Sequence, residues 1–357
     1  MLTAAPATLE LLQAALNGTG PALLPTTEQR VLAVLRPDLP LERDDIAVVV
    51  PTSGSTGEPK GALLTADNLL ASARASADRL GGQGQWLLAI PSTHIGGLQV
   101  LVRSLLAGTE PVELTGSTTR ESFEAATARL TGPRRYVSLV PTQLARLADS
   151  DVLLAYDAVL LGGAAPPASL LARVRARGVR VVTTYGMSET SGGCVYDGQP
   201  LAGVTVEVTD RIMLTGPVVG VGYRLRPDLA RAAFAGSTFT TADLGGLDAD
   251  GRLVVLGRAD DVIVTGGEKV APSAVESALA AHPAVAEVAV IGVPDEEWGA
   301  RVRAVVVLRP GATLSVEEAR EQVASALPRA AAPRELVVLD ALPLLDSGKI
   351  DRMKLAR

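Results

Sequence analysis

The chain has 357 residues, of which 47% are hydrophobic and 20% charged, and its formal net charge is -6. A chain of this length exceeds the roughly 250 to 300 residues at which a single hydrophobic core stops growing, so we expect two domains. The acidic balance excludes the broad basic face that nucleic-acid binding or an anionic membrane surface requires. We therefore expect no nucleic acid as a partner.

Cysteine usage and the first residues indicate the compartment. The single cysteine, Cys194, excludes an intramolecular disulfide framework and is typical of a reducing interior. Residues 1–11 lack a basic segment followed by an apolar core, and no run approaches the roughly 18 apolar residues of a spanning helix. We expect a cytoplasmic protein that is not exported and does not span a membrane.

The first predicted element is a strand at residues 46–50, an apolar and β-branched run. A polar segment rich in glycine, Thr52 to Gly61, follows it. Thr65 is a good N-cap and Asp67 is favourable in a first helical turn, which predicts a helix from there to the glycine pair at 81–82. Strand, glycine loop and helix in this order are typical of an α/β fold.

Later apolar runs repeat this alternation. With a helix such as 167–176 between them, they predict strands at residues 86–90, 136–140, 158–161 and 179–183. The expected fold class is therefore α/β, with a mostly parallel sheet covered by helices. After Val204 the pattern changes to short strands and turns, including a hairpin at 248–251, which predicts an antiparallel region closing the first lobe.

The segment 260–357 predicts a small α+β domain. Its expected elements, in order, are a strand at 262–265, a turn at Gly266 and Gly267, a helix from Pro272, strands at 285–293 and 302–308, and a helix that opens with Ser315 and Glu318 at capping-box spacing. We place the junction at 258–261 and divide the chain into domains 1–259 and 260–357.

The segment from Thr52 to Gly61 has the composition of a polyphosphate site. Its glycines and hydroxyls allow backbone N–H groups and side chains to surround phosphate oxygens, while Lys60 adds a compact positive charge. It is not a Walker A loop, because no Gly-Lys-Ser/Thr follows the first glycine at the required spacing. Taken alone, such a segment is usually a flexible turn.

Five further motifs follow in a fixed order and decide between these readings. The six motifs are Thr52-Ser-Gly-Ser-Thr-Gly-Glu-Pro-Lys-Gly61, Tyr185-Gly-Met-Ser-Glu-Thr190, Thr241-Ala-Asp-Leu-Gly245, Gly257-Arg-Ala-Asp-Asp261, Gly266-Gly-Glu-Lys269 and Ser347-Gly-Lys-Ile-Asp351. In this order the chain resembles the adenylate-forming superfamily, which includes acyl- and aryl-CoA ligases, luciferases and adenylation domains of peptide synthetases. The resemblance covers residue 46 to the C-terminus and implies a large adenylation domain followed by a small mobile domain.

This resemblance implies a site for ATP and Mg²⁺. Tyr185 would stack on the adenine, Thr190 would contact phosphate and Glu189 would hold Mg²⁺. Without the motifs, Asp243 could be a turn aspartate and Arg258 a surface ion pair. The implied ATP- and AMP-binding residues are Thr52, Ser53, Gly54, Ser55, Thr56, Gly57, Lys60, Gly162, Gly163, Ala164, Tyr185, Thr190, Asp243 and Arg258.

The implied catalytic residues are Lys349, Glu189, Thr190 and His94. Lys349 lies in a glycine-containing loop, from which a long ammonium group could reach both the carboxylate and the α-phosphate as negative charge builds up. A solvated tail lysine is the alternative, and it is the reading that we give to Lys354.

The family forms the adenylate and the thioester in two arrangements of its small domain. By this resemblance Asp260 is the hinge, and Gly266, Gly267 and Lys269 face coenzyme A, which passes close to a tight glycine turn. A plain hairpin is the alternative. Cys194 is not expected to act as a nucleophile, because the reactive thiol belongs to the coenzyme.

The acid is expected to contact His94, Gly186 and Ser191. His94 follows a predicted strand, where an α/β sheet presents its ligands, although a histidine at a strand end is more often structural. Segments such as 132–136, 139–143 and 191–198 resemble those of compact o-succinylbenzoate:CoA ligases of menaquinone biosynthesis, whose substrate carries a second carboxylate. About 45 residues precede the phosphate loop, fewer than is usual in the family.

Three functions remain to be compared. The first is an AMP-forming acid:CoA ligase acting on o-succinylbenzoate with ATP and coenzyme A. The second is a stand-alone adenylation enzyme that loads another aryl acid onto coenzyme A or a carrier protein; an amino acid is disfavoured because 91–97 and 183–193 contain no aspartate. The third is a non-catalytic nucleotide-binding relative, which would not need Glu189, Asp243, Arg258 and Lys349 together. The sequence leaves open whether the chain forms a homodimer.

Overall fold

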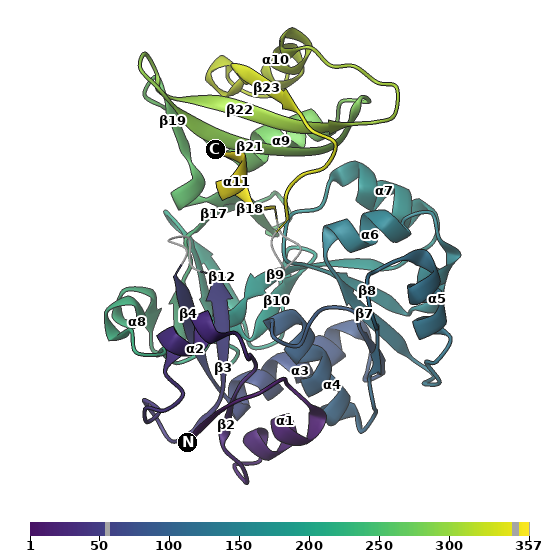
Figure 1. Ribbon diagram of the computed structural model, residues 1–357, viewed down its shortest axis with the longest axis vertical. Helices are drawn as coiled ribbons and strands as arrows, with labels where there is room; N and C mark the ends of the chain where they lie inside the picture. The colour runs from purple at the N-terminus through teal and green to yellow at the C-terminus, as the bar shows by residue number, and fades with distance from the viewer. Residues whose placement is uncertain (54–57, 345–349, 357) are drawn as a thin grey trace. The chain divides into compact units, whose positions relative to one another are not determined.

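The computed structural model describes residues 1–53, 58–344 and 350–356, without the side chain of Ser53. The chain divides into two compact units, one within residues 1–165, 173–241 and 249–253 and the other within 166–172, 242–248 and 254–357. Sheets and helices alternate along it (Figure 1), which confirms the predicted α/β class.

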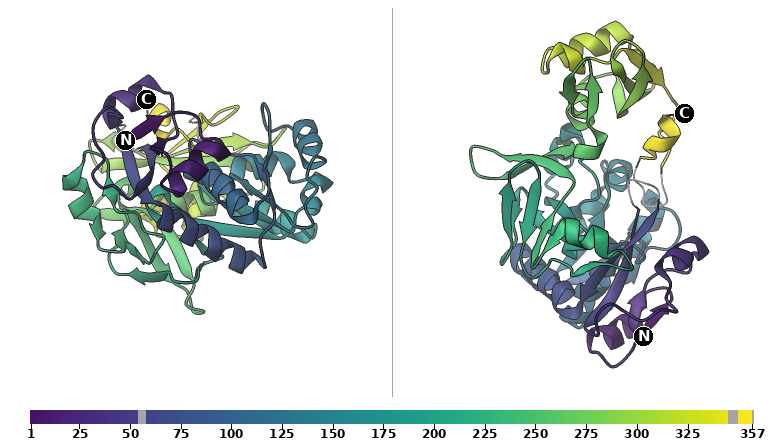
Figure 2. Two further views of the ribbon diagram at one scale, coloured as in Figure 1. Left: turned by 90° about the horizontal axis from the view of Figure 1, so that it is seen from below. Right: turned by 90° about the vertical axis from the view of Figure 1, so that its left-hand side faces the viewer.

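The first sheet of the first unit begins with residues for which the sequence predicted no element. Its strand order is β1 (Leu2–Ala4), β2 (Ala22–Leu24), β3 (Ile46–Ser53), β4 (Pro59–Thr65) and β14 (Gly222–Tyr223). The strands β1, β2 and β3 are parallel, whereas β4 is antiparallel to both β3 and β14. Helices α1 (Leu9–Leu16) and α2 (Gln29–Leu35) connect the first three strands, and Figure 2 shows this N-terminal segment in purple.

The glycine-rich segment joins two antiparallel strands, because β4 lies between it and the next helix. Thr52 pairs with Lys60, and the last residues of β4 are buried. The expected order of strand, loop and helix therefore omitted one strand. Helix α3 (Ala66–Leu80) is confirmed: the Thr65 hydroxyl accepts from the Asn68 N–H in a capping box, and Gly81 ends the helix with a φ of 95°.

A seven-stranded sheet forms the rest of the α/β core. Its order is β11 (Gln199–Pro200), β10 (Gly192–Tyr196), β9 (Val181–Met187), β8 (Ala158–Leu161), β7 (Arg135–Leu139), β5 (Gln85–Leu88) and β6 (Val112–Glu113). The strands from β6 to β9 are parallel and β10 is antiparallel, which confirms a mostly parallel sheet. Helices α3 and α4 (Ile95–Ala107) pack against each other and against β10 (Figure 1).

The predicted strands of this sheet are confirmed with one change of length. The strand expected at 179–183 continues to Met187, so that Tyr185 and Gly186 lie within β9. Because the carboxyl ends of parallel strands meet at one edge of a sheet, the segments after β5, β7, β8 and β9 converge there. The further helices of the sheet connections are α5 (Arg120–Thr127), α6 (Pro141–Leu147) and α7 (Ala168–Ala176), with short 3-10 helices η1 (Asp151–Ala155) and η2 (Ser188–Thr190).

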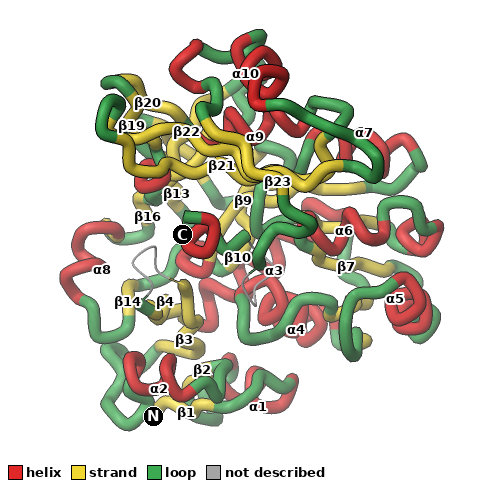
Figure 3. The backbone as a smooth tube through the Cα atoms, turned by 45° about the horizontal axis from the view of Figure 1, so that its top comes forward, coloured by secondary structure: helices red, strands yellow, loops and turns green. Residues whose placement is uncertain are grey.

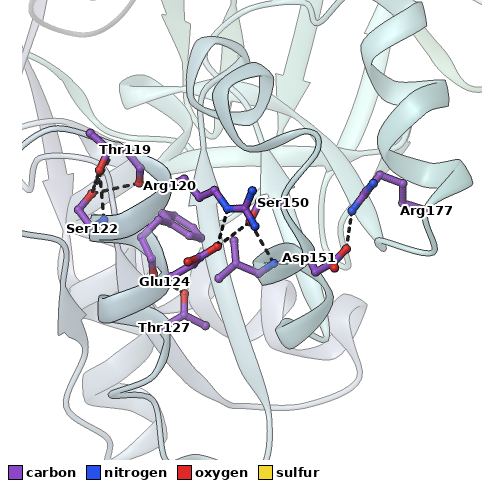
Figure 4. Close-up of polar contacts among 10 residues, drawn as sticks. Thr119, Arg120, Ser122, Glu124, Thr127, Ser150, Asp151 and Arg177 are labelled. Carbon is purple, nitrogen blue, oxygen red and sulfur yellow. Dashed lines mark hydrogen bonds and ion pairs between the residues drawn. The ribbon is translucent and has the colours of Figure 1, made fainter.

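Polar contacts fasten α5 and η1 to their surroundings (Figure 4). Glu124 accepts from Arg120 at 2.7 Å and from the Ser150 hydroxyl at 3.3 Å, and Arg177 donates to Asp151 at 2.5 Å. These ion pairs are exposed and therefore contribute little to stability. The contacts of Glu124 join α5, in the connection after β6, to the residue before η1.

That connection is tied to the carboxyl edge of the sheet by one glutamine. Gln143 Nε2 donates to the Thr118 hydroxyl at 3.1 Å and to the carbonyl of Ala89 at 2.8 Å. The segments that follow β5, β6 and β7 are therefore joined at this edge.

The first unit ends in the antiparallel region that the sequence predicted. Its sheet has the order β12 (Thr205–Val208), β13 (Ile212–Thr215), β16 (Thr238–Thr240) and β15 (Phe234–Ala235), with helix α8 (Pro227–Ala233) before β15. All its described pairs are antiparallel. The buried side chains of Ile212, Leu214 and Phe239 join a core shared with β10.

The second unit contains a two-stranded sheet of β17 (Asp243–Leu247) and β18 (Leu253–Arg258) and a second sheet around its own core (Figure 3). The strands of that sheet are β20 (Glu268–Val270), β19 (Ile263–Thr265), β22 (Gly299–Leu308), β21 (Val285–Asp295) and β23 (Glu335–Val338). The helices are α9 (Pro272–Ala280), α10 (Val316–Ala324), α11 (Arg352–Leu355) and the 3-10 helices η3 (Ala259–Asp261) and η4 (Arg329–Ala331). These elements confirm the predicted order after residue 260, including the capping box of Ser315 and Glu318.

Candidate active site

The predicted phosphate segment leaves β3 and returns on β4. Thr52 and Lys60 stand opposite each other at the end of this pair, so both side chains belong to one strand end. Lys60 Nζ lies 5.7 Å from the centroid of the Tyr223 ring on the neighbouring strand β14, within the range of a cation–π contact. The predicted residues Gly54, Ser55, Thr56, Gly57 and Lys349, and the side chain of Ser53, lie outside the described part of the chain.

Glu189 is the carboxylate that the sequence assigned to Mg²⁺, and it is held by the same tyrosine. The Tyr223 hydroxyl donates to Glu189 Oε1 at 2.8 Å, and Glu189 is only 9% exposed. Lys60, Tyr223 and Glu189 thus form one cluster from β4, β14 and η2. Tyr223 was not predicted from the sequence, because no local pattern indicates that residue 223 lies beside residues 60 and 189.

This cluster fits a magnesium–phosphate site. Within the described ranges, no three His, Cys, Asp or Glu side chains form a group that could hold a metal ion. A single carboxylate is the arrangement that suits Mg²⁺ bound together with substrate phosphates, since this ion keeps several water or phosphate ligands. Glu189 would hold the ion, and Lys60 would add positive charge beside it.

A change of Glu189 to glutamine is expected to lower the rate of adenylate formation about 10²-fold. The amide keeps an acceptor for Tyr223 but loses the negative charge, so the Mg²⁺ concentration at half-maximal rate should rise. ATP–pyrophosphate exchange over a Mg²⁺ titration measures this. Tyr223→Phe keeps the ring beside Lys60 and removes only the hydrogen bond to Glu189, so it separates the loss of that bond from the loss of the charge. A wild-type Mg²⁺ dependence in Glu189→Gln would contradict the assignment.

The predicted adenine residues meet at the carboxyl ends of β8 and β9. Gly162 follows β8 directly, and a Cβ there would lie 2.5 Å from the Thr184 hydroxyl oxygen, one residue before Tyr185. Gly163 has a φ of 86°, and both Gly163 and Ala164 are exposed. Since Tyr185 is also partly exposed, this edge offers an aromatic ring beside open backbone.

Thr190 does not present its hydroxyl to a ligand, in contrast to the predicted phosphate contact. It is 0% exposed, and its hydroxyl donates toward the carbonyls of Gly192 and Met187 at 2.9 and 3.2 Å while it accepts from the Met187 N–H at 3.0 Å. The hydroxyl therefore closes its own turn. Ser188, two residues earlier in η2, also carries a hydroxyl and is partly exposed.

Ser188→Ala is therefore expected to raise the KM for ATP about three- to tenfold, as the loss of one hydrogen bond to a charged group would. The folded protein should keep its unfolding midpoint. Steady-state adenylation kinetics against ATP concentration measure the change. An unaltered KM in Ser188→Ala would contradict the expectation that the Ser188 hydroxyl binds phosphate.

Ser191, which the sequence predicted to contact the acid, is likewise buried. Its exposure is 0%, and its hydroxyl donates to the carbonyl of Val218 at 2.9 Å. Gly186 differs: it is partly exposed, has a φ of 154°, and a Cβ there would overlap the carbonyl oxygen of Gly192. Only glycine fits where β9 passes the Gly192 turn.

His94 occupies the N-cap position of α4, where its side chain makes no capping hydrogen bond. The side chain is partly exposed. The next residue, Ile95, lies near the Gly192 turn, because a Cβ on Gly192 would be 3.7 Å from Ile95 Cγ1. The structure therefore places the start of α4 beside the strand end that carries Gly186, as an acid-binding role requires.

Cys194 is fully buried in β10, and burial raises the pKa of its thiol to about 12. The thiol is therefore protonated at neutral pH and out of reach of substrate.

In the second unit, Asp243 opens β17 and Arg258 closes β18. Arg258 Nη1 lies 3.7 Å from the Asp243 carboxylate, and its Nη2 donates to Asp260 at 2.9 Å. Burial lowers the pKa of Arg258, but the hydrogen bond to Asp260 and the charge of Asp243 outweigh it and raise the pKa overall. The two predicted nucleotide-binding residues, Asp243 and Arg258, thus form one charged cluster with the predicted hinge Asp260.

The predicted coenzyme A residues lie on the β19–β20 hairpin. Gly266 and Gly267 have φ values of 57° and 84°, and Lys269 is exposed. A Cβ on Gly266 would lie 2.7 Å from the ring of Trp298, on which Arg334 stacks with its guanidinium carbon 3.9 Å from the ring centroid. This exposed arginine and the tryptophan beside the turn were not predicted from the sequence.

Comparison with known proteins agrees with this geometry. The model of the AMP-binding enzyme family matches residues 14–226, and that of the AMP-binding enzyme C-terminal domain matches residues 274–349. A protein of Mycobacterium tuberculosis (strain CDC 1551 / Oshkosh) called probable 2-succinylbenzoate–CoA ligase is 48% identical over 98% of this chain and 94% of its own length.

Among the described residues, no helix has the length and apolar character needed to cross a bilayer.

Solved structures show the same fold. The o-succinylbenzoate CoA synthetase from Bacillus subtilis in complex with ATP and magnesium ion has a TM-score of 0.80 at 28% identity, over 100% of this chain and 89% of its own. The same enzyme with the acyl-adenylate intermediate has a TM-score of 0.77 at 30% identity, over 98% and 81% of the two chains. With matches over both parts of the sequence, the chain belongs to the AMP-binding enzyme family.

Proposed function

We propose that this protein is an AMP-forming acid:CoA ligase that converts o-succinylbenzoate, ATP and coenzyme A to o-succinylbenzoyl-CoA, AMP and diphosphate. The cluster of Lys60, Tyr223 and Glu189 is the structural observation that carries the ATP-dependent step. Two similarities support o-succinylbenzoate as the acid. This chain is 48% identical to the Mycobacterium tuberculosis relative, and it shares its fold with the Bacillus subtilis synthetase.

In the first half-reaction a carboxylate oxygen of the acid attacks the α-phosphorus of ATP, and the bond to diphosphate breaks. Negative charge accumulates around the α-phosphate in the transition state. Positive charge that is already held in place there lowers the barrier. Glu189 would hold Mg²⁺ there, Lys60 and Lys349 would add positive charge, and Ser188 would donate a hydrogen bond. Tyr185 and residues 162–164 would hold the adenine.

In the second half-reaction the thiol sulfur of coenzyme A attacks the acyl carbon, and AMP leaves. We assign this step to the arrangement in which domain 260–357 has turned about Asp260, with Gly266, Gly267 and Lys269 toward the coenzyme. Trp298 and Arg334 beside this turn supply an aromatic face and a cation suited to a nucleotide that carries phosphate. We place the protein in the cytoplasm, because the single cysteine, Cys194, is typical of a reducing compartment.

For the acid, His94 at the start of α4 is the proposed side chain of the pocket, and Gly186 supplies space beside it. A histidine N–H and backbone N–H groups can donate hydrogen bonds to either carboxylate of o-succinylbenzoate. The ammonium group of an amino acid would find no aspartate in segments 91–97 and 183–193.

The test is pyrophosphate release with ATP, Mg²⁺ and a panel of aryl and alkyl acids, with coenzyme A present or absent and mass analysis of the thioester. We expect a thioester from o-succinylbenzoate at a kcat/KM well above that for benzoate, which lacks the second carboxylate. Pyrophosphate release without a coenzyme A product would favour the carrier-protein loading enzyme instead. No release with any acid would favour a nucleotide-binding relative.

A further inference from the structure

Two buried side chains outside the proposed site converge on one carbonyl group. Gln99 of α4 donates from Nε2 to the Ser191 carbonyl oxygen at 2.9 Å, and the Ser72 hydroxyl of α3 donates to the same oxygen at 3.0 Å. The exposures of Ser72, Gln99 and Ser191 are 0%, 1% and 0%. Ser191 lies directly after η2, the turn that carries Glu189. Two long helices are thus hydrogen-bonded to the end of this turn.

Ser191 has a backbone conformation that needs such support. Its φ is 53°, in the left-handed region, which a residue with a Cβ adopts only at a cost in free energy. Its N–H donates to the Ser188 carbonyl at 3.1 Å and its hydroxyl to the Val218 carbonyl at 2.9 Å. Every polar atom of Ser191 is therefore bonded, and the surrounding structure fixes the conformation.

The choice of glutamine at position 99 also needs a reason. Gln99 Nε2 serves the Ser191 carbonyl and, at 3.3 Å, the Leu69 carbonyl, whereas Gln99 Oε1 is buried without a hydrogen-bond partner among the described residues. An unsatisfied buried acceptor is unfavourable, and a methionine of similar size would avoid it. The useful part of the side chain is therefore its pair of donors.

We propose that Gln99 and Ser72 are positioning residues for the magnesium-binding turn and act on adenylate formation through the Ser191 carbonyl. This inference rests on the proposed function and names how its metal ligand is held. Glu189 is two residues from Ser191, and a displacement of about 1 Å at a catalytic group can lower a rate about 100-fold. Both residues are too deeply buried to touch nucleotide or acid themselves.

The experiment compares Gln99→Met and Ser72→Ala with Ser76→Ala. Ser76 lies one turn later on α3, is also 0% exposed, and shares its hydroxyl with the Tyr196 hydroxyl at 2.8 Å instead of the turn. ATP–pyrophosphate exchange is measured over Mg²⁺ and ATP concentrations. We expect kcat/KM to fall about 10- to 100-fold in Gln99→Met and about three- to tenfold in Ser72→Ala. The Mg²⁺ concentration at half-maximal rate should rise in both and stay unchanged in Ser76→Ala.

A double mutant separates positioning from a general loss of structure. If Gln99 acts through the metal ligand, Gln99→Met should lower the rate less than about threefold further when Glu189→Gln is already present. Independent losses in the double mutant would overturn the proposal. So would equal kinetic losses in Ser76→Ala, or wild-type kinetics in Gln99→Met with only a lower unfolding midpoint. If Gln99→Met does not fold, Ser72→Ala supports the same cycle.

The same measurements distinguish a failure of the proposed function. Exchange by the wild-type protein with another acid, but not with o-succinylbenzoate, would overturn the substrate and leave the positioning role measurable with that acid. Normal exchange with o-succinylbenzoate in both the wild type and Gln99→Met would overturn the positioning role alone. A wild-type protein without exchange on any acid would overturn both.

Discussion

Lys349→Ala is expected to lower adenylate formation by about 10³-fold or more while ATP binding stays measurable. Lys349 lies outside the described residues, so the expectation comes from its motif and from electrostatics. An ammonium group that meets the α-phosphate and the attacking carboxylate stabilises charge that is present mainly in the transition state, so its loss should reduce kcat more than affinity. Pyrophosphate exchange and ATP binding by calorimetry measure the two quantities separately.

Lys354 provides the matched control, because it is the same residue type five positions later. Its side chain is 66% exposed and its Nζ lies 3.5 Å from the Asp351 carboxylate, a surface pair that contributes little. Lys354→Ala should therefore retain wild-type exchange. Normal adenylation by Lys349→Ala would remove its catalytic assignment, and equal losses in the two variants would indicate an effect of the terminal segment as a whole.

Arg224→Met is expected to lower the free energy of unfolding of the first unit by about 3–5 kcal/mol. The Arg224 side chain is fully buried beside β14, and its guanidinium forms an ion pair with Glu42 at 3.0 Å. It also donates to four backbone carbonyls of the segment after α2, those of Leu35, Arg36, Leu39 and Pro40. Methionine would remove the side-chain donor of the Leu35, Leu39 and Pro40 carbonyls, and acceptors that lose their partner on burial are costly. The Arg36 carbonyl and the Glu42 carboxylate would keep only the N–H groups of Leu39 and Leu225.

The same arginine supports the active site through its backbone. Its N–H donates to the Gly61 carbonyl at 2.8 Å, and a Cβ on Gly61 would lie 3.0 Å from Arg224 Cβ. Gly61 follows Lys60, and Arg224 follows Tyr223, so the contact holds β4 and β14 together beside the cluster. Methionine keeps this N–H and this Cβ, so Arg224→Met that still folds should leave the KM for ATP unchanged.

Arg226→Met is the control for this prediction. Arg226 is two residues further on, and its ion pair with Asp228 is exposed on both sides. Its loss should leave the urea-unfolding midpoint unchanged, because solvent screens the pair and can replace it. A midpoint for Arg224→Met equal to that of Arg226→Met would contradict the role of the buried guanidinium.

The local elements of the fold were predictable where the physics is local. The apolar β-branched run at 46–50 gave β3, and Thr65 with the glycine pair at 81–82 gave both ends of α3, because caps act on N–H and carbonyl groups one turn away. The elements after residue 260 followed in the same way. The boundary between domains 1–259 and 260–357 stays a prediction.

The missed elements are those whose apolar pattern is short. The strands β1 and β2 have three residues each, too few for a period to show, and they exist because they pair with β3. Strand β4 was not predicted, because it begins with the polar residues that end the glycine-rich segment. In each case the free energy that forms the strand comes from pairing partners and burial, which local propensity does not contain.

The sequence alone determined the family of this protein and the chemistry that its motifs can carry, since residue types and their order are what motifs consist of. The tertiary structure decided which of those side chains are buried and which are exposed. Thr190 and Ser191 have suitable hydroxyls, but both are buried and bonded to backbone, while Ser188 is partly exposed. The contacts of Tyr223 with Glu189 and of Gln99 and Ser72 with Ser191 arise only on folding, because a hydrogen bond between residues 34 to 119 positions apart depends on where the strands and helices bring the two atoms.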